Sequence, residues 1–435
     1  MNNAWGVTSS GVTAGKNITE EAFGEVDIPL IYNTPFIKSF SLSGSGRYTQ
    51  FKATRAEDGA TASDKNNWTY KIGANWQVTD FLRFRGSYGT SYRAPALFEE
   101  FLANQSGFGS RRAIDPCIGL QTKINAGLSP TSVLVKNCAA AGITNLNFTG
   151  GSASNVEVLT GGGLGVVKAE TSTAKTASII LTPRFGFLPR TKINLAVDWF
   201  SIKVKGEISQ LGAANVVGLC YNSNFYPNDP LCGQFDRDPT TLAITQVRDE
   251  YININEQKNE GIDVTANIAQ DLGSWGKLSA TAEMTWQTVD YVALFSTTRQ
   301  SNNGEDGEPI WTGAFNLSWE KGTFSVYYGL NVVGGTSDVG DYIQDNGATC
   351  LTSALYPNGY CERLRAKPTF YHSISLTKEL PGFQVTIGVS NLFNTKPPQV
   401  STFNNGEITT IGNSVFSSQY DLLGRRGFVS IKTHF

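Results

Sequence analysis

The sequence predicts an all-β protein, a transmembrane antiparallel up-and-down β-barrel, on three observations. First, apolar residues alternate with polar or small residues along many stretches. Second, short turns alternate with long polar connections. Third, aromatic residues lie at the ends of the apolar faces. Strict alternation is typical of strands with two different faces. Barrel strands are about 10 residues long and are apolar at every second position, so they need no continuous apolar run.

Alternation is clearest at 68–77, where Trp68, Tyr70, Ile72, Ala74 and Trp76 share one face. A soluble sandwich also alternates, but paired Trp residues at both ends of a face are typical of the aromatic girdles of a membrane barrel. The pattern predicts about thirteen strands, near 18–31, 37–52, 67–77, 81–92, 166–183, 190–208, 249–269, 277–290, 309–320, 323–336, 367–379, 383–393 and 419–435.

The connections between these strands are of two kinds. Tight turns, such as 79–80 and 321–322, alternate with long polar stretches. Short periplasmic turns opposite long external loops are the asymmetry expected of an outer-membrane barrel. We expect external loops near 93–165, 209–248, 291–308, 337–366 and 395–418.

The start of the chain does not fit a complete barrel. The segment Met1–Trp5 has no basic region followed by an apolar one, so no signal peptide is visible. Thirteen is also an odd number, whereas single-chain bacterial barrels are usually even. We therefore expect that strands are missing from the front.

Composition excludes several classes of function. The net charge is −2 over 435 residues and no basic helix or zinc-finger spacing is present, so nucleic acid is not an expected partner. The sequence contains no run of about 18 apolar residues, so it predicts no membrane-spanning helix. His372 and His434 are the only histidines, so no catalytic triad is predicted and we expect no enzyme and no cofactor. Asp338, Asp341 and Asp345 are candidate calcium ligands, but their spacing does not match an EF-hand, and no metal site is assigned.

Six cysteines lie in three close pairs within the long loops. An even count in local pairs on polar segments predicts disulfides in an oxidising compartment. Six cysteines allow 15 connectivities, and sequential pairing is favoured if each loop folds as its own unit. The predicted disulfides are Cys117 with Cys138, Cys220 with Cys232, and Cys350 with Cys361.

The last strand ends on an aromatic residue. Val429, Ile431, Thr433 and Phe435 share the face expected toward lipid. Such an ending resembles the recognition signal of the outer-membrane assembly machinery, although an ordinary strand can also stop at Phe435. Counting back from this strand places every tight turn on the periplasmic side.

Three motifs in order resemble TonB-dependent outer-membrane receptors over residues 20–435. The first is Glu21–Leu30 followed by Gly46-Arg47-Tyr48, and the second is Arg93-Ala94-Pro95 where a strand enters a long loop. The third is Asn391-Leu392-Phe393 followed by the last strand, which contains Gly424-Arg425 and ends at Phe435. Arg93 lies close in sequence to Glu99 and Glu100, so a salt bridge at the rim is the plain structural expectation.

The resemblance implies a 22-stranded barrel plugged by an N-terminal domain that carries the TonB box. Residues 1–435 are then a partial barrel domain with the plug absent. The implied function is energy-coupled uptake of a scarce ligand of the iron-siderophore, cobalamin or carbohydrate class. The implied partners are outer-membrane lipid, the TonB-ExbB-ExbD system acting through the missing plug, the assembly machinery and an unknown small molecule, in the outer membrane of a Gram-negative bacterium.

Two alternatives remain. A passive porin-like outer-membrane channel of about 14 strands needs no plug, and a secreted soluble β-protein needs neither plug nor membrane. If the chain is a receptor, the loop aromatics Tyr221, Phe225, Tyr226 and Tyr356 are candidates for ligand contact, against the alternative that they pack within their loops. Charged residues on the other face of the strands are expected opposite the plug: Lys71, Arg83, Arg85, Asp198, Asp263 and Glu283.

Overall fold

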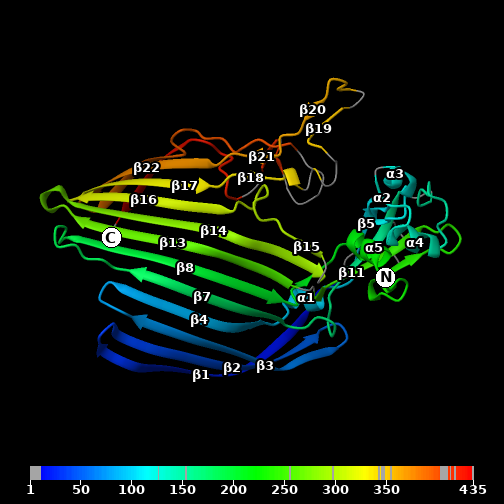
Figure 1. Cartoon of the computed structure of the whole chain (residues 1–435), viewed down its shortest axis with the longest axis horizontal. Helices are drawn as coiled ribbons and strands as arrows, with labels where there is room; N and C mark the ends of the chain where they lie inside the picture. Colours follow the sequence, from blue (N-terminus) through cyan, green and yellow to red (C-terminus); the bar gives the residue numbers. More distant parts are fainter. Residues whose placement is uncertain are drawn as a thin grey trace.

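One antiparallel sheet contains most of the strands (Figure 1). The computed structural model describes residues 11–125, 127–151, 154–253, 256–295, 298–340, 343, 348–352, 355–401, 410–411, 413–415 and 418–433. The strands follow one another in the order β1-β2-β3-β4-β7-β8-β13-β14-β16-β17-β22-β23-β26, with β15 beside β14. Their bounds are β1 Gly15–Thr34, β2 Ile37–Arg55, β3 Thr61–Gln77, β4 Leu82–Arg93, β7 Glu170–Leu181, β8 Thr191–Lys205, β13 Glu256–Asp271, β14 Lys277–Phe295, β15 Thr298–Gln300, β16 Trp311–Lys321, β17 Phe324–Val333, β22 Thr369–Leu380, β23 Phe383–Ser390 and β26 Arg426–Thr433.

Each of the predicted strands overlaps one strand of this path, so the predicted all-β, up-and-down order is confirmed for the described chain. The predicted start of the last strand, at 419, is wrong. Asp421 accepts hydrogen bonds from the backbone N–H groups of Leu423 and Gly424, and Gly424 has φ +76°, so this segment is a turn. A carboxylate that binds its own following backbone competes with strand pairing, and β26 therefore begins only at Arg426.

The two ends of the sheet differ as predicted. At one end, here called the turn end, adjacent strands join directly; Gly322 and Gly382 adopt φ +59° and +80° in the tightest of these turns, where glycine has no steric penalty. The opposite end, here called the loop end, carries the long connections that follow β4, β8, β14, β17 and β23. In Figure 1 the turn end lies at the left and the loop end at the right.

The two faces of the sheet also differ. On the apolar face, Trp76 contacts Phe84 on the next strand at 5.5 Å between ring centroids, and Tyr48 contacts Trp68 at 5.1 Å. Large apolar side chains stay open on this face, as Ile72 at 59% exposure illustrates. An exposed apolar surface of this kind marks a site of contact with a membrane or a partner.

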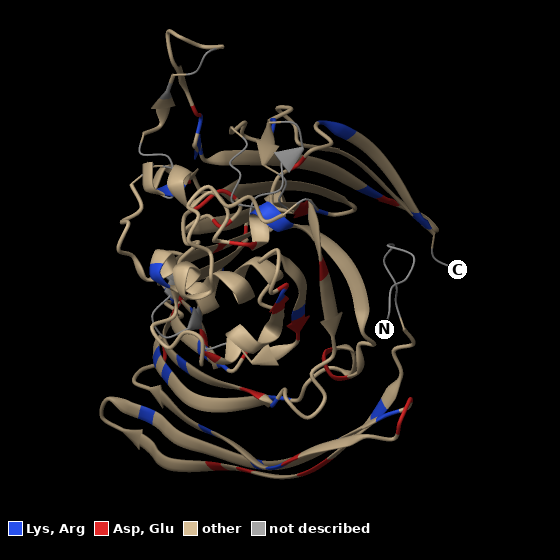
Figure 2. Ribbon diagram, turned by 90° about the vertical axis from the view of Figure 1, so that its right-hand side faces the viewer, with Lys and Arg blue, Asp and Glu red and all other residues tan. Residues whose placement is uncertain are grey.

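The sheet is bent into a trough (Figure 2). Among the residues that the structure describes, β1 pairs only with β2 and β26 only with β23, so two strand edges are free. No helix in the described ranges is long and apolar enough to cross a membrane.

A separate lobe lies beyond the loop end of the strands (Figure 1). It consists of a four-stranded sheet, in the order β10-β11-β6-β5, and short helices. Figure 2, viewed from the loop end, shows the lobe in front of the space that the bent sheet surrounds. Its elements are β5 Gln105–Ser110, α2 Arg111–Ile114, α3 Leu120–Asn125, α4 Val133–Ala140, β6 Asn155–Gly161, α5 Ala213–Asn222, η1 Pro230–Gln234, β10 Phe235–Arg237 and β11 Ile244–Glu250.

The remaining elements are short and lie in the connections. They are α1 Leu97–Phe101, β9 Ile208–Ser209, β12 Ile252–Asn253, η2 Gly273–Trp275, β18 Thr336–Ser337, β19 Cys350–Leu351, β20 Tyr360–Cys361, β21 Arg365–Ala366, β24 Thr410–Ile411 and β25 Ser414–Val415.

Candidate ligand-binding site

The lobe is built from two long loops that fold around one apolar core. The connection after β4 supplies Leu120 and Val156, and the connection after β8 supplies Val217, Ile244 and Val247, all at most 1% exposed. These two loops therefore share one core and do not fold as separate units. The strands of different loops pair directly, because β6 and β11 form a parallel ladder.

A buried ion pair also joins the two loops. The Asp115 carboxylate is fully buried and lies 2.8 Å from Nη1 of Arg237, whose side chain is 10% exposed. Arg237 also donates to the Tyr221 hydroxyl at 3.0 Å from its Nε. A buried charge that lacks its partner is costly, so this pair fixes the position of one loop relative to the other.

The three predicted disulfides are confirmed. The Cα–Cα distances are 5.7 Å for Cys117–Cys138, 5.0 Å for Cys220–Cys232 and 4.0 Å for Cys350–Cys361. The first two bridges lie in the lobe, one in each loop, and the third joins β19 to β20 elsewhere at the loop end. Together the first two bridges and the ion pair make the lobe a preorganised surface.

The Arg93-Ala94-Pro95 motif forms the rim at which the sheet meets the lobe. Arg93 donates to Glu99 at 3.0 and 3.1 Å and forms a second ion pair with Glu170 on β7. Glu170 in turn accepts the backbone N–H of Ile208 at 2.9 Å. The predicted salt bridge to Glu99 is confirmed, and its extension to Glu170 was not visible in sequence because the two residues are 77 positions apart.

Beside this cluster, Glu100 is buried at 2% exposure, and its Oε2 has no hydrogen-bond partner among the described residues. Burial, and after it the charge of Glu99, raises the pKa of Glu100 to about 7. The chain packs tightly here: a Cβ at Gly162 would collide with the carbonyl of Glu100, while the N–H of Gly162 binds the carbonyl of Leu102 at 2.8 Å. Only glycine permits so close an approach at position 162.

The candidate ligand-contacting aromatics fall into two groups. Tyr221 is 1% exposed and stacks on Tyr226 at 5.3 Å, so it belongs to the lobe core and presents no surface to a ligand in this structure. Phe225 and Tyr356 are 77% and 59% exposed. These two rings are therefore open to solvent in this structure, and ligand contact by them stays a prediction.

Charged residues gather on the polar face of the main sheet. Asp198 and Asp263 lie directly opposite each other on neighbouring strands, and Arg85 reaches Asp198 at 3.3 Å. Asp263 accepts a hydrogen bond from Thr285 at 2.6 Å. Four of the charged residues, Lys71, Arg85, Asp198 and Asp263, border a cavity of about 450 Å³. Arg83 instead binds Gln77 at 2.6 Å, nearer the turn end.

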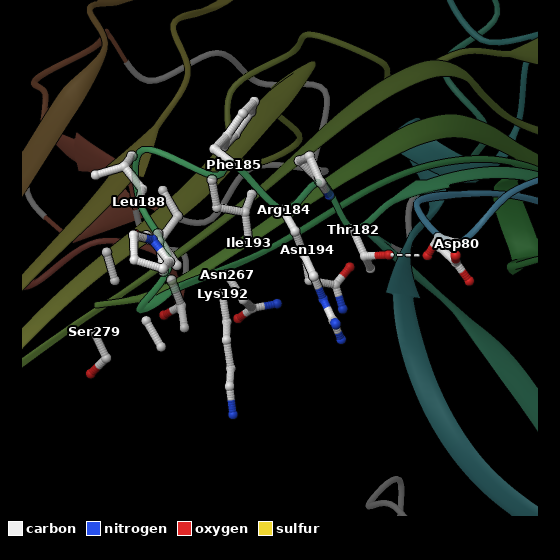
Figure 3. A pocket seen from close by; sticks show the side chains of 17 residues that line it. Asp80, Thr182, Arg184, Phe185, Leu188, Lys192, Ile193, Asn194, Asn267 and Ser279 are labelled. Carbon is white, nitrogen blue, oxygen red and sulfur yellow. Dashed lines mark hydrogen bonds between the residues drawn. The ribbon is translucent and has the colours of Figure 1, made fainter. Parts of the chain in front are cut away.

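A second cavity, of about 720 Å³, lies at the turn end (Figure 3). The connection from β7 to β8 covers it with Phe185 and Leu188, and Lys192, Asn194 and Asn267 line it from β8 and β13 (Figure 3). The connection is held in place by the Thr182 hydroxyl, which donates to the carbonyl of Asp80 at 3.3 Å. Sequence reasoning missed this cavity, because its walls come from segments that show only an ordinary strand pattern.

The structure brings the two C-terminal motif segments together. Asn391 has φ +50°, is buried, and donates to the Thr395 carbonyl at 2.9 Å and to Asp421 at 3.2 Å. The N–H of Arg425 binds the side chain of Asn394 at 3.0 Å. Leu392, Phe393 and Gly424 lie in the same two segments, so these motif positions belong to the contact that joins the two ends of the connection between β23 and β26. Phe435 lies outside the described residues.

The chain belongs to the family described as "TonB dependent receptor-like, beta-barrel", whose model matches residues 2–392. Members of this family are receptors and transporters of the Gram-negative outer membrane that work with the TonB system; they are not enzymes. The predicted family is thereby confirmed. No curated protein matches the chain.

Solved structures show the same fold. The siderophore receptor PirA from Acinetobacter baumannii superposes with a TM-score of 0.51 at 14% identity, over 97% of this chain and 55% of that one. A mutant of the ferric enterobactin receptor PfeA from Pseudomonas aeruginosa gives 0.51 at 13% identity, over 97% and 54%. A second PfeA mutant, in complex with enterobactin, gives 0.51 at 14% identity, over 96% and 54%. The chain thus spans just over half the length of these receptors.

Proposed function

We propose that this chain forms part of the β-barrel of an outer-membrane receptor for energy-coupled uptake of a scarce ligand, and that the lobe is its capture element. The observation that carries the proposal is the lobe itself. Two disulfides and a buried ion pair stabilise its two loops internally. The lobe lies at the loop end of the sheet, in front of the space that the sheet surrounds (Figure 2). A surface that is already ordered loses little conformational entropy when it binds a ligand.

The ligand class that we favour is an iron-siderophore complex, ahead of cobalamin and carbohydrate. Phe225 presents an open aromatic ring on the lobe at 77% exposure. Such a ring stacks on flat aryl groups or on sugar faces. Two of the similar structures are a siderophore receptor and a ferric enterobactin receptor, so we would test iron complexes first.

The partners follow from the family and from the faces of the sheet. The apolar face, with Ile72 and Ile431 open at 59% and 66%, suits outer-membrane lipid. The free edges at β1 and β26 suit further strands that complete a barrel of 22, since unpaired strand edges do not occur in the hydrocarbon core of a membrane. The TonB-ExbB-ExbD system is the proposed source of energy, acting through a plug, and the terminal strand is the proposed signal to the assembly machinery.

Uptake by cells that express the intact gene tests this function. Labelled ferric enterobactin, cyanocobalamin and maltohexaose are each supplied to the gene-deletion strain and to the complemented strain, with and without a protonophore. We expect one ligand to depend on the gene, with uptake that stops when the protonophore is added. Uptake that ignores the protonophore, together with a steady open conductance in planar bilayers, would instead establish the passive porin-like channel.

The role of the lobe is tested by one substitution and its matched control. Phe225→Ala removes an open ring from the lobe, and Phe187→Ala removes one that is 79% exposed at the turn end. Loss of an aromatic contact of about 1.4 kcal/mol raises Kd about tenfold. We expect this change for Phe225→Ala with the transported ligand and no change for Phe187→Ala; equal Kd values for both variants would contradict capture by the lobe.

A further inference from the structure

An apolar cavity of about 510 Å³ lies on the apolar face of the main sheet, over the strands β3, β4, β7 and β8. Small residues on adjacent strands form its floor, because Ala74 pairs with Gly86 and Gly86 pairs with Ala177. Larger side chains surround this floor, among them Trp76, Phe84, Ile179 and Trp199. The cavity therefore has a small, apolar floor and walls that are mostly aromatic.

The apolar cavity is open on the side where a membrane barrel meets lipid. Side chains alternate along a strand, so Ala74 shares the apolar face with Ile72, which is 59% exposed. A Cβ built on Gly86 would meet only the backbone oxygen of Thr176 within 4 Å, so no side chain fills the space above Gly86. Empty apolar space forfeits dispersion contacts. An unbranched acyl chain is flexible enough to fill such a space.

A group of lysines begins beside this cavity, on the same face and toward the loop end. Lys175 is two positions from Ala177 on β7 and therefore belongs to the same face. The register of β7 with β8 makes Lys203 a diagonal neighbour of Lys175, at about 7–8 Å. Lys205 follows on β8, and Lys258 on β13 pairs with Lys203. These four residues are here called the lysine patch.

The lysine patch carries more positive charge than its neighbours balance. Nζ of Lys203 lies 2.6 Å from Glu256, and Nζ of Lys258 lies 2.7 Å from Glu260. The other two lysines of the patch are exposed and form no ion pair with any residue that the structure describes. Like charges on facing strands destabilise a sheet, so the two unpaired cations favour an anion from outside the chain.

The apolar cavity and the lysine patch occupy successive layers of the sheet surface. On β7 the apolar face changes from Ala177 to Lys175, and on β8 it changes from Trp199 to Lys203. Ala177 and Trp199 are register partners, so the change begins at the same level on both strands. On the outside of a membrane barrel, such a change marks the boundary between acyl chains and headgroups. A lipid whose chain lies in the cavity thus has its headgroup beside the lysines.

We propose that the apolar cavity and the lysine patch together bind a phosphorylated lipid of the outer leaflet. One acyl chain lies in the cavity, and the phosphate lies at Lys175 with the other lysines of the patch around the headgroup. Lysine binds phosphate as a compact point charge. An acyl chain and a basic patch together give stable attachment, whereas one chain alone binds weakly. The inference rests on the proposed function for its orientation, since the loop end must face the cell exterior.

The experiment uses the intact receptor in detergent, with diphosphoryl lipid A as the probe. Native mass spectrometry measures the lipid retained across a titration and compares it with phosphatidylcholine, which carries no net charge and should bind more weakly. Lys175→Met should raise the Kd for lipid A about fivefold, the effect of one lysine at an anionic lipid surface. Ala177→Phe should raise it about tenfold, because the new ring takes the room of about two methylene groups of the chain.

Two matched variants should keep the wild-type Kd. Lys192→Met removes an exposed lysine from the polar face, near the turn end. Ala266→Phe adds a ring to the apolar face on β13, outside the cavity. Circular dichroism verifies that each variant keeps the wild-type fold.

The proposal is overturned if wild type binds phosphatidylcholine as tightly as lipid A, or if Lys175→Met or Ala177→Phe keeps the wild-type Kd. It is also overturned if Ala177→Phe converts a receptor dimer into a monomer, because a second copy of the chain would then fill the cavity. The measurement needs neither a transported ligand nor an energy source. A failure of gene-dependent uptake would therefore contradict the proposed function and leave the lipid site standing.

Discussion

Arg237 donates two hydrogen bonds to the carboxylate of Asp115, at 2.8 Å and 2.9 Å, across 122 positions of the chain. The parallel arrangement of the two bonds uses the planar guanidinium fork, which lysine lacks. Asp115 also accepts the backbone N–H of Cys117 at 3.0 Å. One contact thus connects the second loop of the lobe to the disulfide-closed turn of the first.

Replacing one partner of this pair should destabilise the lobe strongly. Arg237→Met leaves the fully buried Asp115 carboxylate without its cation, which costs about 3–5 kcal/mol. The double variant Arg237→Met with Asp115→Leu should recover most of that loss, because neither charge remains. Urea-dependent proteolysis of the lobe in the full chain measures the difference, with exposed Arg112→Met as the control; a double variant no more stable than the single one would contradict this account.

The buried Glu100 gives the rim a dependence on pH. Its folded-state pKa of about 7 lies above the ordinary value of 4.5. Between these two values the folded protein binds more protons than the unfolded one, so stability is highest below about pH 4.5 and falls as pH rises through 7.

Glu100→Gln should remove this fall, because glutamine stays neutral at every pH. We expect the variant to match wild type near pH 4.5 and to be more stable above pH 7, as measured by thermal unfolding across the range. Glu57→Gln changes an exposed carboxylate and should retain the wild-type slope. If Glu100→Gln kept that slope as well, the burial of Glu100 would not be its cause.

Removing a lobe disulfide should act on the lobe alone. Replacing Cys220 and Cys232 by serine opens a closed segment of 12 residues, and the chain-entropy relation gives a loss of about 3 kcal/mol. Replacing Cys350 and Cys361, which join a hairpin outside the lobe, should leave lobe stability unchanged. The same urea-dependent proteolysis separates the two cases, and equal losses in both would show that the lobe is not an independent unit.

The guanidinium group of Arg93 should hold α1 in place through its hydrogen bonds to Glu99. Arg93→Lys keeps the charge but cannot bond Glu99 and Glu170 in the observed geometry. We expect faster hydrogen exchange at the amides of α1 and at Ile208, whose N–H binds Glu170. Arg85→Lys, on the polar face of the sheet, is the control and should leave α1 unchanged; unaltered exchange in Arg93→Lys would remove Arg93 from this role.

The main sheet was predictable because its signal is local. Trp68, Tyr70 and Ile72 lie at every second position of β3 and therefore share one face of the strand. Such alternation can be read from the strand's own sequence wherever one face of the sheet is apolar. The lobe carries no such signal. Its ladder between Val158 and Val247 joins residues 89 positions apart, and nothing in either segment alone specifies the other.

The candidate site shows the same division. Cysteine pairing followed from spacing within each loop, and all three pairs were correct. Tyr221 and Phe225 lie four positions apart in one disulfide-closed segment, yet one is buried and the other open. Exposure there depends on residues beyond the disulfide, such as Phe235 and Arg237, which contact the Tyr221 ring, and so could not be inferred from the segment itself.

The candidate calcium ligands also depend on contacts between loops. The Asp338 carboxylate accepts the backbone N–H of Asp306, from another connection, at 2.8 Å. Asp341 and Asp345 lie outside the described residues.

The sheet of the lobe takes two strands, β5 and β6, from one loop and two, β10 and β11, from the other. A loop transferred alone from a relative by recombination would bring half of a sheet and half of a core. The two loops therefore form a single unit of inheritance, and changes at facing positions such as Glu157 and Gln246, whose side chains bond at 2.9 Å, should be retained in pairs as the lobe diversifies.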